Sequence, residues 1–314
     1  MSERETDDET PRASDAPTTS APPMKEGPPM FEHHATFPLP APTERAFAAL
    51  VDPVQLSRWF AERVTIEPRS GGAFTIGGRG ALGATNSITA VEPGRMLAFT
   101  WSLYDVPTEV RLRITDGKEP GTSTLEVDHV VRGALPVRNG KHFIDDLWRH
   151  HAGNLAEHLR GGSNVALPDL GSDNPEVRVS IEIAAKPAKV FRALLEPELM
   201  NKWLFATAKV DVAAGTYSYG WKYEHEGRQV AGGPTRIVEL VENEKLVTDW
   251  TDWRGDPDKP LTRITWLLEP LDGGARTRVT VIHDGFEHPV DRSDYHQGWA
   301  GFLDGLSKVV AELA

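Results

Sequence analysis

The stretch AFAALVDPVQLSRWF at residues 46–60 recurs as VFRALLEPELMNKWL at residues 190–204. Each copy is an apolar run that a proline interrupts and that a tryptophan closes. The same order continues downstream, since VEPGRMLAFTW at 91–101 corresponds to LVENEKLVTDW at 240–250. A spacing of about 150 residues is far longer than the repeat of a solenoid, about 20–50 residues, so it indicates two copies of a whole domain.

The second copy predicts its elements most clearly. The segment VRVSIEI at 177–183 alternates apolar and polar residues, as a half-buried strand does. Pro187 and Pro197 suit the first turns of two short helices that end near residue 204. Alternating segments between 206 and 284 predict strands, and apolar residues at three- and four-residue steps over 295–313 predict an amphipathic terminal helix.

The order of these elements predicts an α+β fold. One face of an antiparallel sheet must be covered, and only the terminal helix is long enough to cover it. The first half repeats the order, with a strand at 31–39, helices over 43–60, strands up to 131 and a helix over 142–160. We therefore expect one domain at 31–162 and another at 177–314, joined by a polar linker at 163–176.

Residues 1–30 differ in kind from the rest of the chain. They are rich in Pro, Ser and Thr, carry more acids than bases, and have few apolar residues, so we expect a disordered acidic tail. The tail lacks the basic start and apolar run of a secretory signal. No apolar run in the sequence approaches the roughly 18 residues that a membrane span needs. We expect a cytoplasmic protein without membrane insertion.

Charge and composition exclude several function classes. The net charge of −12 argues against nucleic acid or an anionic membrane as the main partner, because both require clustered Lys and Arg. The sequence has no cysteine, which excludes a disulfide framework, thiol catalysis and zinc held by cysteine.

Motifs that suggest a cofactor or a metal are weak. The segment GRGALG at 78–83 fits a dinucleotide fingerprint, but a loop and a strand follow it rather than the required helix, so we interpret it as a hairpin connection. His150 and His158 are eight residues apart, whereas helical metal pairs prefer four. His225 falls where a hairpin turn is expected. We predict no cofactor, no metal and no catalytic residue.

The repeated pattern resembles the START-like or SRPBCC superfamily, and within it the branch named for the C-terminal domain of the activator of Hsp90 ATPase. The resemblance rests on the apolar helix, the proline, the short helix that ends in Trp59-Phe60 or Trp203-Leu204, and the later strand that ends in Trp101 or Trp250. It implies tandem helix-grip domains, in each of which a curved antiparallel sheet wraps around a long C-terminal helix with a cavity between them.

Aromatic and histidine residues near the implied cavities are the candidate ligand-binding residues. Trp101 and Trp250 lie on central strands that face the helix, and both copies place a histidine near the end of the last strand. Each histidine could bridge strand and helix or could serve as a polar anchor at the cavity rim. The candidates are Phe99, Trp101 and His129 in the first copy, and Tyr219, Trp221, Trp250, Trp266 and His283 in the second, which we expect to have the more developed pocket.

Three hypotheses about function follow. The first is a protein that binds a small apolar or aromatic ligand. The second is a co-chaperone-like protein that regulates a partner ATPase, although no chaperone-binding domain precedes residue 31. The third, a cyclase or hydrolase of the same fold, requires a polar constellation that the two copies do not share. A large apolar pocket favours the first of these.

Overall fold

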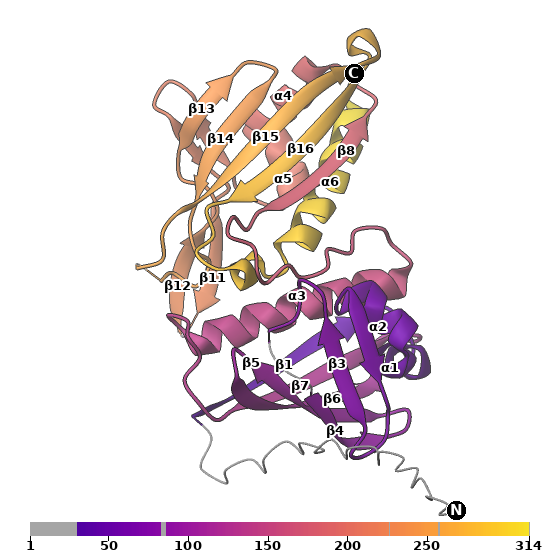
Figure 1. The fold of residues 1–314 in the computed structure, drawn as a ribbon. Coiled ribbons are helices and arrows are strands. Elements are labelled where there is room, and N and C mark those ends of the chain that lie inside the picture. Colours follow the sequence, from indigo (N-terminus) through magenta and orange to yellow (C-terminus); the bar gives the residue numbers. More distant parts are fainter. Residues whose placement is uncertain (1–29, 83–85, 226, 257, 314) are drawn as a thin grey trace, which may run out of the picture.

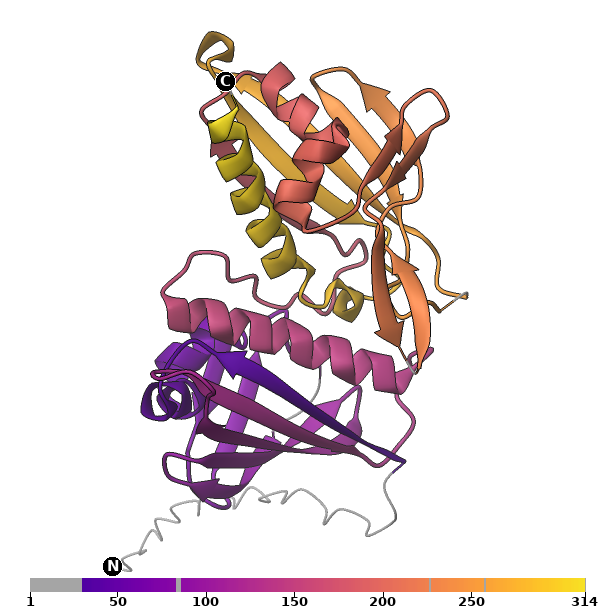
Figure 2. The ribbon, with the colours of Figure 1, turned by 180° about the vertical axis from the view of Figure 1, so that it is seen from behind.

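The structure is a computed structural model that describes residues 30–82, 86–225, 227–256 and 258–313, and it consists of two stacked α+β domains (Figure 1). The expected tail, apart from its last residue, lies outside the described residues. The helix α3 of the first domain runs across its sheet on the side that faces the second domain (Figures 1 and 2).

The first domain is a seven-stranded antiparallel sheet in the order β1-β7-β6-β5-β4-β3-β2. Its strands are β1 (Phe31–Leu39), β2 (Arg63–Ile66), β3 (Ala73–Gly77), β4 (Asn86–Glu92), β5 (Met96–Leu103), β6 (Val106–Asp116) and β7 (Ser123–Val131). Its helices are α1 (Thr43–Val51), α2 (Pro53–Trp59) and α3 (Gly140–Arg160). The glycine-rich segment 78–83 belongs to the connection between β3 and β4, and its last residue lies outside the described part of the chain.

The second domain repeats this order around a five-stranded sheet, β13-β14-β15-β16-β8. That sheet is formed by β8 (Val177–Ile183), β13 (Ile237–Val241), β14 (Lys245–Trp250), β15 (Thr262–Leu271) and β16 (Arg276–Asp284). Two separate ribbons pair β9 (Lys209–Asp211) with β10 (Thr216–Ser218) and β11 (Trp221–His225) with β12 (Arg228–Gly232). The helices are α4 (Pro187–Leu195), α5 (Pro197–Leu204), η1 (Asp272–Gly274), η2 (Pro289–Arg292) and α6 (Tyr295–Glu312).

The repeated tryptophan at the end of the second short helix fixes the angle between the two short helices in both domains. Trp59 Nε1 donates a hydrogen bond to the carbonyl oxygen of Ala49 at 3.0 Å, and Trp203 Nε1 donates to that of Ala193 at 3.1 Å. Both indoles are 1% exposed. A buried indole N–H needs an acceptor, so this bond explains why tryptophan recurs here.

The alternation over Tyr217, Tyr219, Trp221 and Tyr223 predicts one strand, but the structure divides this segment between β10 and β11. Gly220, with φ of +73°, breaks the strand, and Gly233, with φ of +88°, follows the return strand β12. Both values lie in the left-handed region that glycine enters without a Cβ penalty. The ribbon β11–β12 therefore leaves the sheet and extends toward α3 of the first domain (Figure 2).

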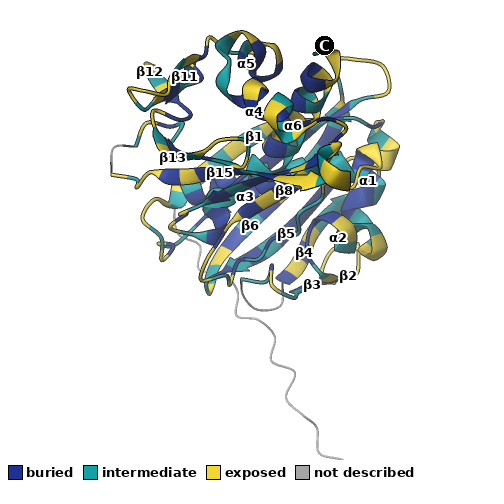
Figure 3. Cartoon of the chain, turned by 90° about the horizontal axis from the view of Figure 1, so that it is seen from above, coloured by how far each residue is buried: buried dark blue, intermediate teal, exposed yellow. Residues whose placement is uncertain are grey.

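Each sheet buries the face that is turned to its helices, and burial alternates along β6 and β7 (Figure 3). The hydrophobic cores are two separate clusters, one in each half of the chain. Two residues from beyond the first half, Leu170 and Val290, belong to the first cluster. The two domains therefore share apolar contacts at their junction.

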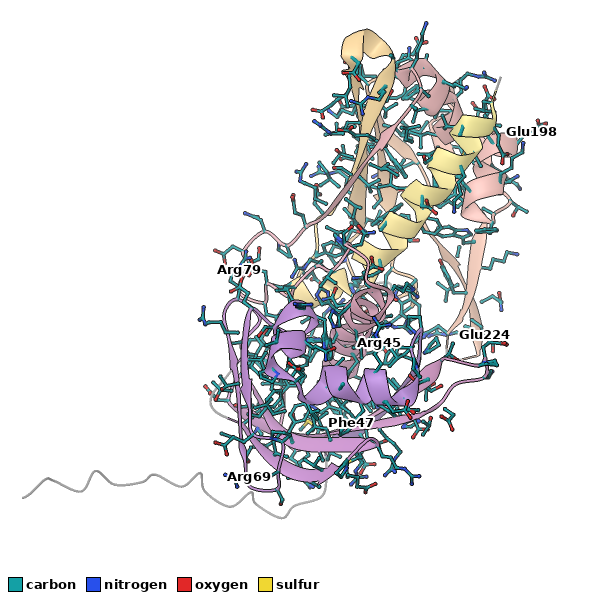
Figure 4. All side chains as sticks on the ribbon, turned by 90° about the vertical axis from the view of Figure 1, so that its right-hand side faces the viewer. Arg45, Phe47, Arg69, Arg79, Glu198 and Glu224 are labelled. Atoms are coloured by element: carbon teal, nitrogen blue, oxygen red, sulfur yellow. The ribbon has the colours of Figure 1, made fainter. Side chains whose placement is uncertain are left out.

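Polar contacts also join the domains. Arg254, 3% exposed in the connection between β14 and β15, donates hydrogen bonds to both carboxylate oxygens of Asp146 on α3, at 3.0 and 2.8 Å. His150 on α3 lies 3.0 Å from the carbonyl oxygen of Ser293 and 2.8 Å from that of Ala166. Arg79, labelled in Figure 4, pairs with Asp169 and so ties the inter-domain connection to the first domain.

Candidate functional site

An open pocket of about 580 Å³ lies in the second domain between the end of α5, the ribbon strand β11 and the start of α6. The ribbon brings β11 to this place because it has left the sheet at Gly220. Rings form most of the walls. The lining consists of Leu204, Phe205, Ala206, Thr207, Gly220, Trp221, Lys222, Tyr223, Trp250, Tyr295, Gly298, Trp299 and Phe302. This set contains no histidine and no carboxylate.

Trp221 holds the ribbon against the helices on both sides of the pocket. Its ring is stacked on that of Phe302 of α6, with centroids 5.4 Å apart and planes at 26°. Its Nε1 donates a hydrogen bond to the carbonyl oxygen of Leu204, the last residue of α5, at 3.2 Å. One side chain therefore fixes the distance between β11, α5 and α6.

Trp250 and Tyr295 form the wall nearest to the sheet. Trp250 Nε1 donates a hydrogen bond to the Tyr295 hydroxyl oxygen at 3.2 Å, and the Trp250 ring is nearly perpendicular to that of Trp221 at 5.9 Å. Burial raises the pKa of Tyr295, so its hydroxyl is neutral. The wall is thus aromatic and uncharged.

The two histidines bridge the helix and the sheet in both domains. Trp148 Nε1 donates to His129 Nδ1 at 2.9 Å, so the proton is on Nε2, which donates to Thr108 Oγ1 at 2.7 Å. Trp299, His283 and Thr262 repeat these bonds at 3.3 and 2.7 Å. Both histidines are fully buried, and neither lines the pocket. Of the two roles weighed for them, the geometry matches the bridge and not the rim anchor.

Burial suppresses the charge of these histidines. It lowers the pKa of His129 to about 3 and that of His283 well below the ordinary value. A neutral imidazole can donate from one nitrogen and accept at the other, which is the pattern that the Trp–His–Thr bridge requires.

The other predicted residues are buried side chains behind or away from the pocket. Phe99 and Trp101 are 1% exposed, and the Trp101 ring contacts those of Phe60, His129, Trp148 and His151. Tyr219 and Trp266 are fully buried, and neither lines the pocket. Tyr219 supports the pocket from behind, since its ring contacts Trp221 at 4.8 Å and Trp250 at 6.0 Å.

The sequence profile of the activator of Hsp90 ATPase homolog 1-like proteins matches this chain twice, at residues 40–160 and 184–311. The chain belongs to that family. Each match covers one sheet and its helices apart from the first strand, β1 or β8, so the family unit occurs in tandem.

Several solved structures are similar to the chain. DynU16, a protein of the dynemicin biosynthetic locus, is 20% identical over 89% of this chain and 98% of its own, with a TM-score of 0.38. CalU16 from Micromonospora echinospora is 24% identical over 42% and 76%, with a TM-score of 0.36. The di-domain ARO/CYC BexL of the BE-7585A biosynthetic pathway is 14% identical over 91% and 100%, with a TM-score of 0.35. No protein of curated function matches the chain.

The two family units differ at the position that opens the pocket. When Trp148 of α3 is aligned with Trp299 of α6, the residue before each is Leu147 in the first unit and Gly298 in the second. Leu147 is 1% exposed, whereas a Cβ added to Gly298 would meet no atom within 4 Å. The second unit thus leaves space where the first has a leucine side chain.

Two of the eight predicted residues, Trp221 and Trp250, line the pocket. Prediction from the sequence did not include Phe205, Gly298 or Phe302. The glycine could have been found by aligning the terminal helices of the two copies, whereas the position of Phe205 depends on its backbone conformation.

Within the described part of the chain, no helix is long and apolar enough to cross a membrane.

Proposed function

We propose that this protein binds a small, apolar, aromatic ligand in the pocket of its second domain. The observation that supports this proposal most is the open aromatic pocket beside Gly298. The first domain has the buried side chain of Leu147 at the corresponding position. The pocket volume of about 580 Å³ lies within the range of small-molecule sites, about 300–1,000 Å³.

The lining favours binding over catalysis. General acid–base chemistry needs a histidine, a carboxylate or a similar group within reach of the reacting atoms. The pocket wall has no histidine and no carboxylate. Of its ionisable side chains, Lys222 is exposed, and burial raises the pKa of Tyr223 and Tyr295. A ligand-binding role also accounts for the aromatic pocket better than a role as a regulator of a partner ATPase, for which a pocket is not needed.

The first domain acts in this proposal as a support. Its sheet and helix enclose Phe60, Trp101 and His151, whose rings lie 4.5–5.6 Å apart. Its helix α3 presents Asp146 to Arg254, four residues after the pocket residue Trp250. The first domain therefore holds the connection that follows one wall of the pocket.

Substitution of two glycines of α6 tests the proposal. Gly298→Leu gives the second domain the residue that fills the first, and we expect it to weaken binding of the fluorescent aromatic probe N-phenyl-1-naphthylamine at least tenfold. Gly301→Leu is the matched control, because a Cβ there also meets no atom within 4 Å and Gly301 does not line the pocket. Leucine has the higher helix propensity, so both variants should melt at or above the temperature of the unchanged protein.

The outcomes are distinct. If the unchanged protein binds neither the probe nor a co-purifying small molecule in native mass spectrometry, the proposed function is wrong. If both leucine variants bind the probe as tightly as the unchanged protein does, the probe binds elsewhere than in this pocket.

A further inference from the structure

Phe205 is an exposed aromatic residue at the edge of the pocket. It follows α5 directly, is 90% exposed and has φ of +51° and ψ of +47°, which is the left-handed region. Helices often end in this conformation, but the residue is then usually glycine or asparagine, because a side chain is strained there. A large apolar side chain in water and a strained backbone both disfavour this arrangement.

The backbone around Phe205 is held in place on both sides. Trp221 Nε1 donates to the carbonyl oxygen of Leu204 at 3.2 Å, and the Thr207 N–H donates to the carbonyl oxygen of Tyr219 at 3.1 Å. The Ala208 N–H donates to Asn201 Oδ1 at 2.7 Å. These bonds keep Phe205 in its strained conformation, as surrounding structure does at functional sites. Only its side chain is left free to change position.

The first domain shows what an aromatic side chain does when it is turned inward at this place. Trp59 and Trp203 align, so Phe60 corresponds to Leu204 and Ala61 to Phe205. Phe60 is 2% exposed and contacts the ring of Trp101 at 5.3 Å. In the second domain the aromatic residue comes one position later, and the left-handed backbone turns it out of the core to the pocket edge.

We propose that Phe205 covers the pocket when a ligand is bound, and that it selects planar aromatic ligands over alkyl chains. The proposal rests on the ligand-binding function proposed above. Phe205 would complete a set of rings with Trp221, Trp250 and Phe302, which already surround the space on the other sides. Aromatic rings gain from stacked and edge-to-face contacts with such walls, whereas an alkyl chain gains from burial alone.

The test compares variants of Phe205 in the full chain. Phe205→Gly removes the ring and relieves the strain, so the melting temperature should rise by about 2–4 °C while N-phenyl-1-naphthylamine binds about three- to tenfold more weakly. Phe205→Trp keeps an aromatic ring and should retain affinity. Val212→Ala, at a valine that is 50% exposed and outside the pocket lining, is the control for loss of an exposed apolar side chain.

Competition with dodecanol tests the selectivity. The ratio of dodecanol affinity to probe affinity should rise in Phe205→Gly, because only the aromatic ligand loses a ring contact. If Phe205→Gly is more stable and binds the probe as well as the unchanged protein does, Phe205 is no cover and the proposal is wrong. If the unchanged protein binds no probe, the ligand-binding function itself fails, which is a different result.

Discussion

Trp148, His129 and Thr108 form a bridge from helix to strand that Trp299, His283 and Thr262 repeat in the second domain. The bridge continues in the first domain, where the Thr108 hydroxyl donates to the carbonyl oxygen of Trp101 at 2.7 Å. Buried polar atoms are stable only with partners, and the polar atoms of this bridge are paired with the next side chain or, at the Thr108 hydroxyl, with a backbone carbonyl. This explains why the same three residue types recur without any ligand contact.

The buried histidines predict a loss of stability in acid. The native imidazole of His129, with its pKa lowered to about 3, stays neutral, whereas the unfolded chain takes up a proton below about pH 6.5. Stability therefore falls as the pH falls from neutral, by about 2 kcal/mol for one such histidine between about pH 7 and pH 5.

His129→Asn should lower the free energy of unfolding at pH 7, because the bridge loses its imidazole. Between pH 7 and pH 5 the variant should lose about 2 kcal/mol less stability than the unchanged protein, as measured by urea denaturation at both pH values. His283→Asn should do the same in the second domain, because burial also lowers the pKa of His283. An unchanged slope in both variants would show that these imidazoles are protonated in the folded protein.

At the scale of elements, α6 closes the second domain and α3 closes the first. At Gly305 the helix α6 packs directly on α5, since a Cβ there would lie in van der Waals contact with Trp203 at 3.4 Å. Leu306 is fully buried, whereas Lys308 is exposed and pairs with Asp304 at 2.6 Å. One face of the helix therefore carries the packing and the other faces water.

Leu306→Ala should destabilise the protein by about 2–5 kcal/mol, because it leaves a cavity between the helix and the sheet. Lys308→Ala should cost less than about 0.5 kcal/mol, since an exposed ion pair of this spacing contributes little. Thermal denaturation of the two variants measures the difference. Equal costs would contradict the docking of α6 on the sheet.

At the scale of the whole molecule, the connection between β14 and β15 joins the domains. Arg254 binds Asp146 and also contacts Asp145, and its guanidinium lies 4.3 Å from the ring centroid of Trp253. Asp146 is 1% exposed, and burial raises its pKa to about 6 although Arg254 opposes that shift. The ion pair is therefore shielded from water, and the loss of either partner leaves a buried charge or forces its neutralisation.

Arg254→Met should cost about 3–5 kcal/mol at pH 8, because the buried Asp146 carboxyl then either stays ionised without its partner or has to take up a proton well above its ordinary pKa. The cost should be smaller near pH 6, where the unpaired carboxyl is protonated. The double variant Arg254→Met with Asp146→Leu should recover most of the loss, as replacement of a buried pair by apolar residues often does. Calorimetry at both pH values measures these differences in stability. If the single and double variants have the same melting temperature, contacts other than the Arg254–Asp146 pair hold the interface together.

The tandem organisation, the α+β class and the two terminal helices were predictable from the sequence, because each depends on local periodicity or on the internal repeat. The fold of the family follows from these elements, and both matches of its profile agree with it. Trp221 and Trp250 could also be placed at a pocket, since strand alternation indicates which face of a strand a side chain shares. The boundaries expected for the domains, and the disorder of the tail, stay predictions.

Other features were decided by the tertiary structure alone. The break at Gly220 turns a predicted strand into a ribbon, and the orientation of Phe205 depends on a left-handed backbone that hydrogen bonds from distant residues maintain. Whether a helix-grip domain is filled or open depends on the summed volumes of side chains from α5, α6 and β11. A periodic pattern reports which face of an element is buried, but an empty space belongs to no single element, so it becomes visible only when the elements are packed together.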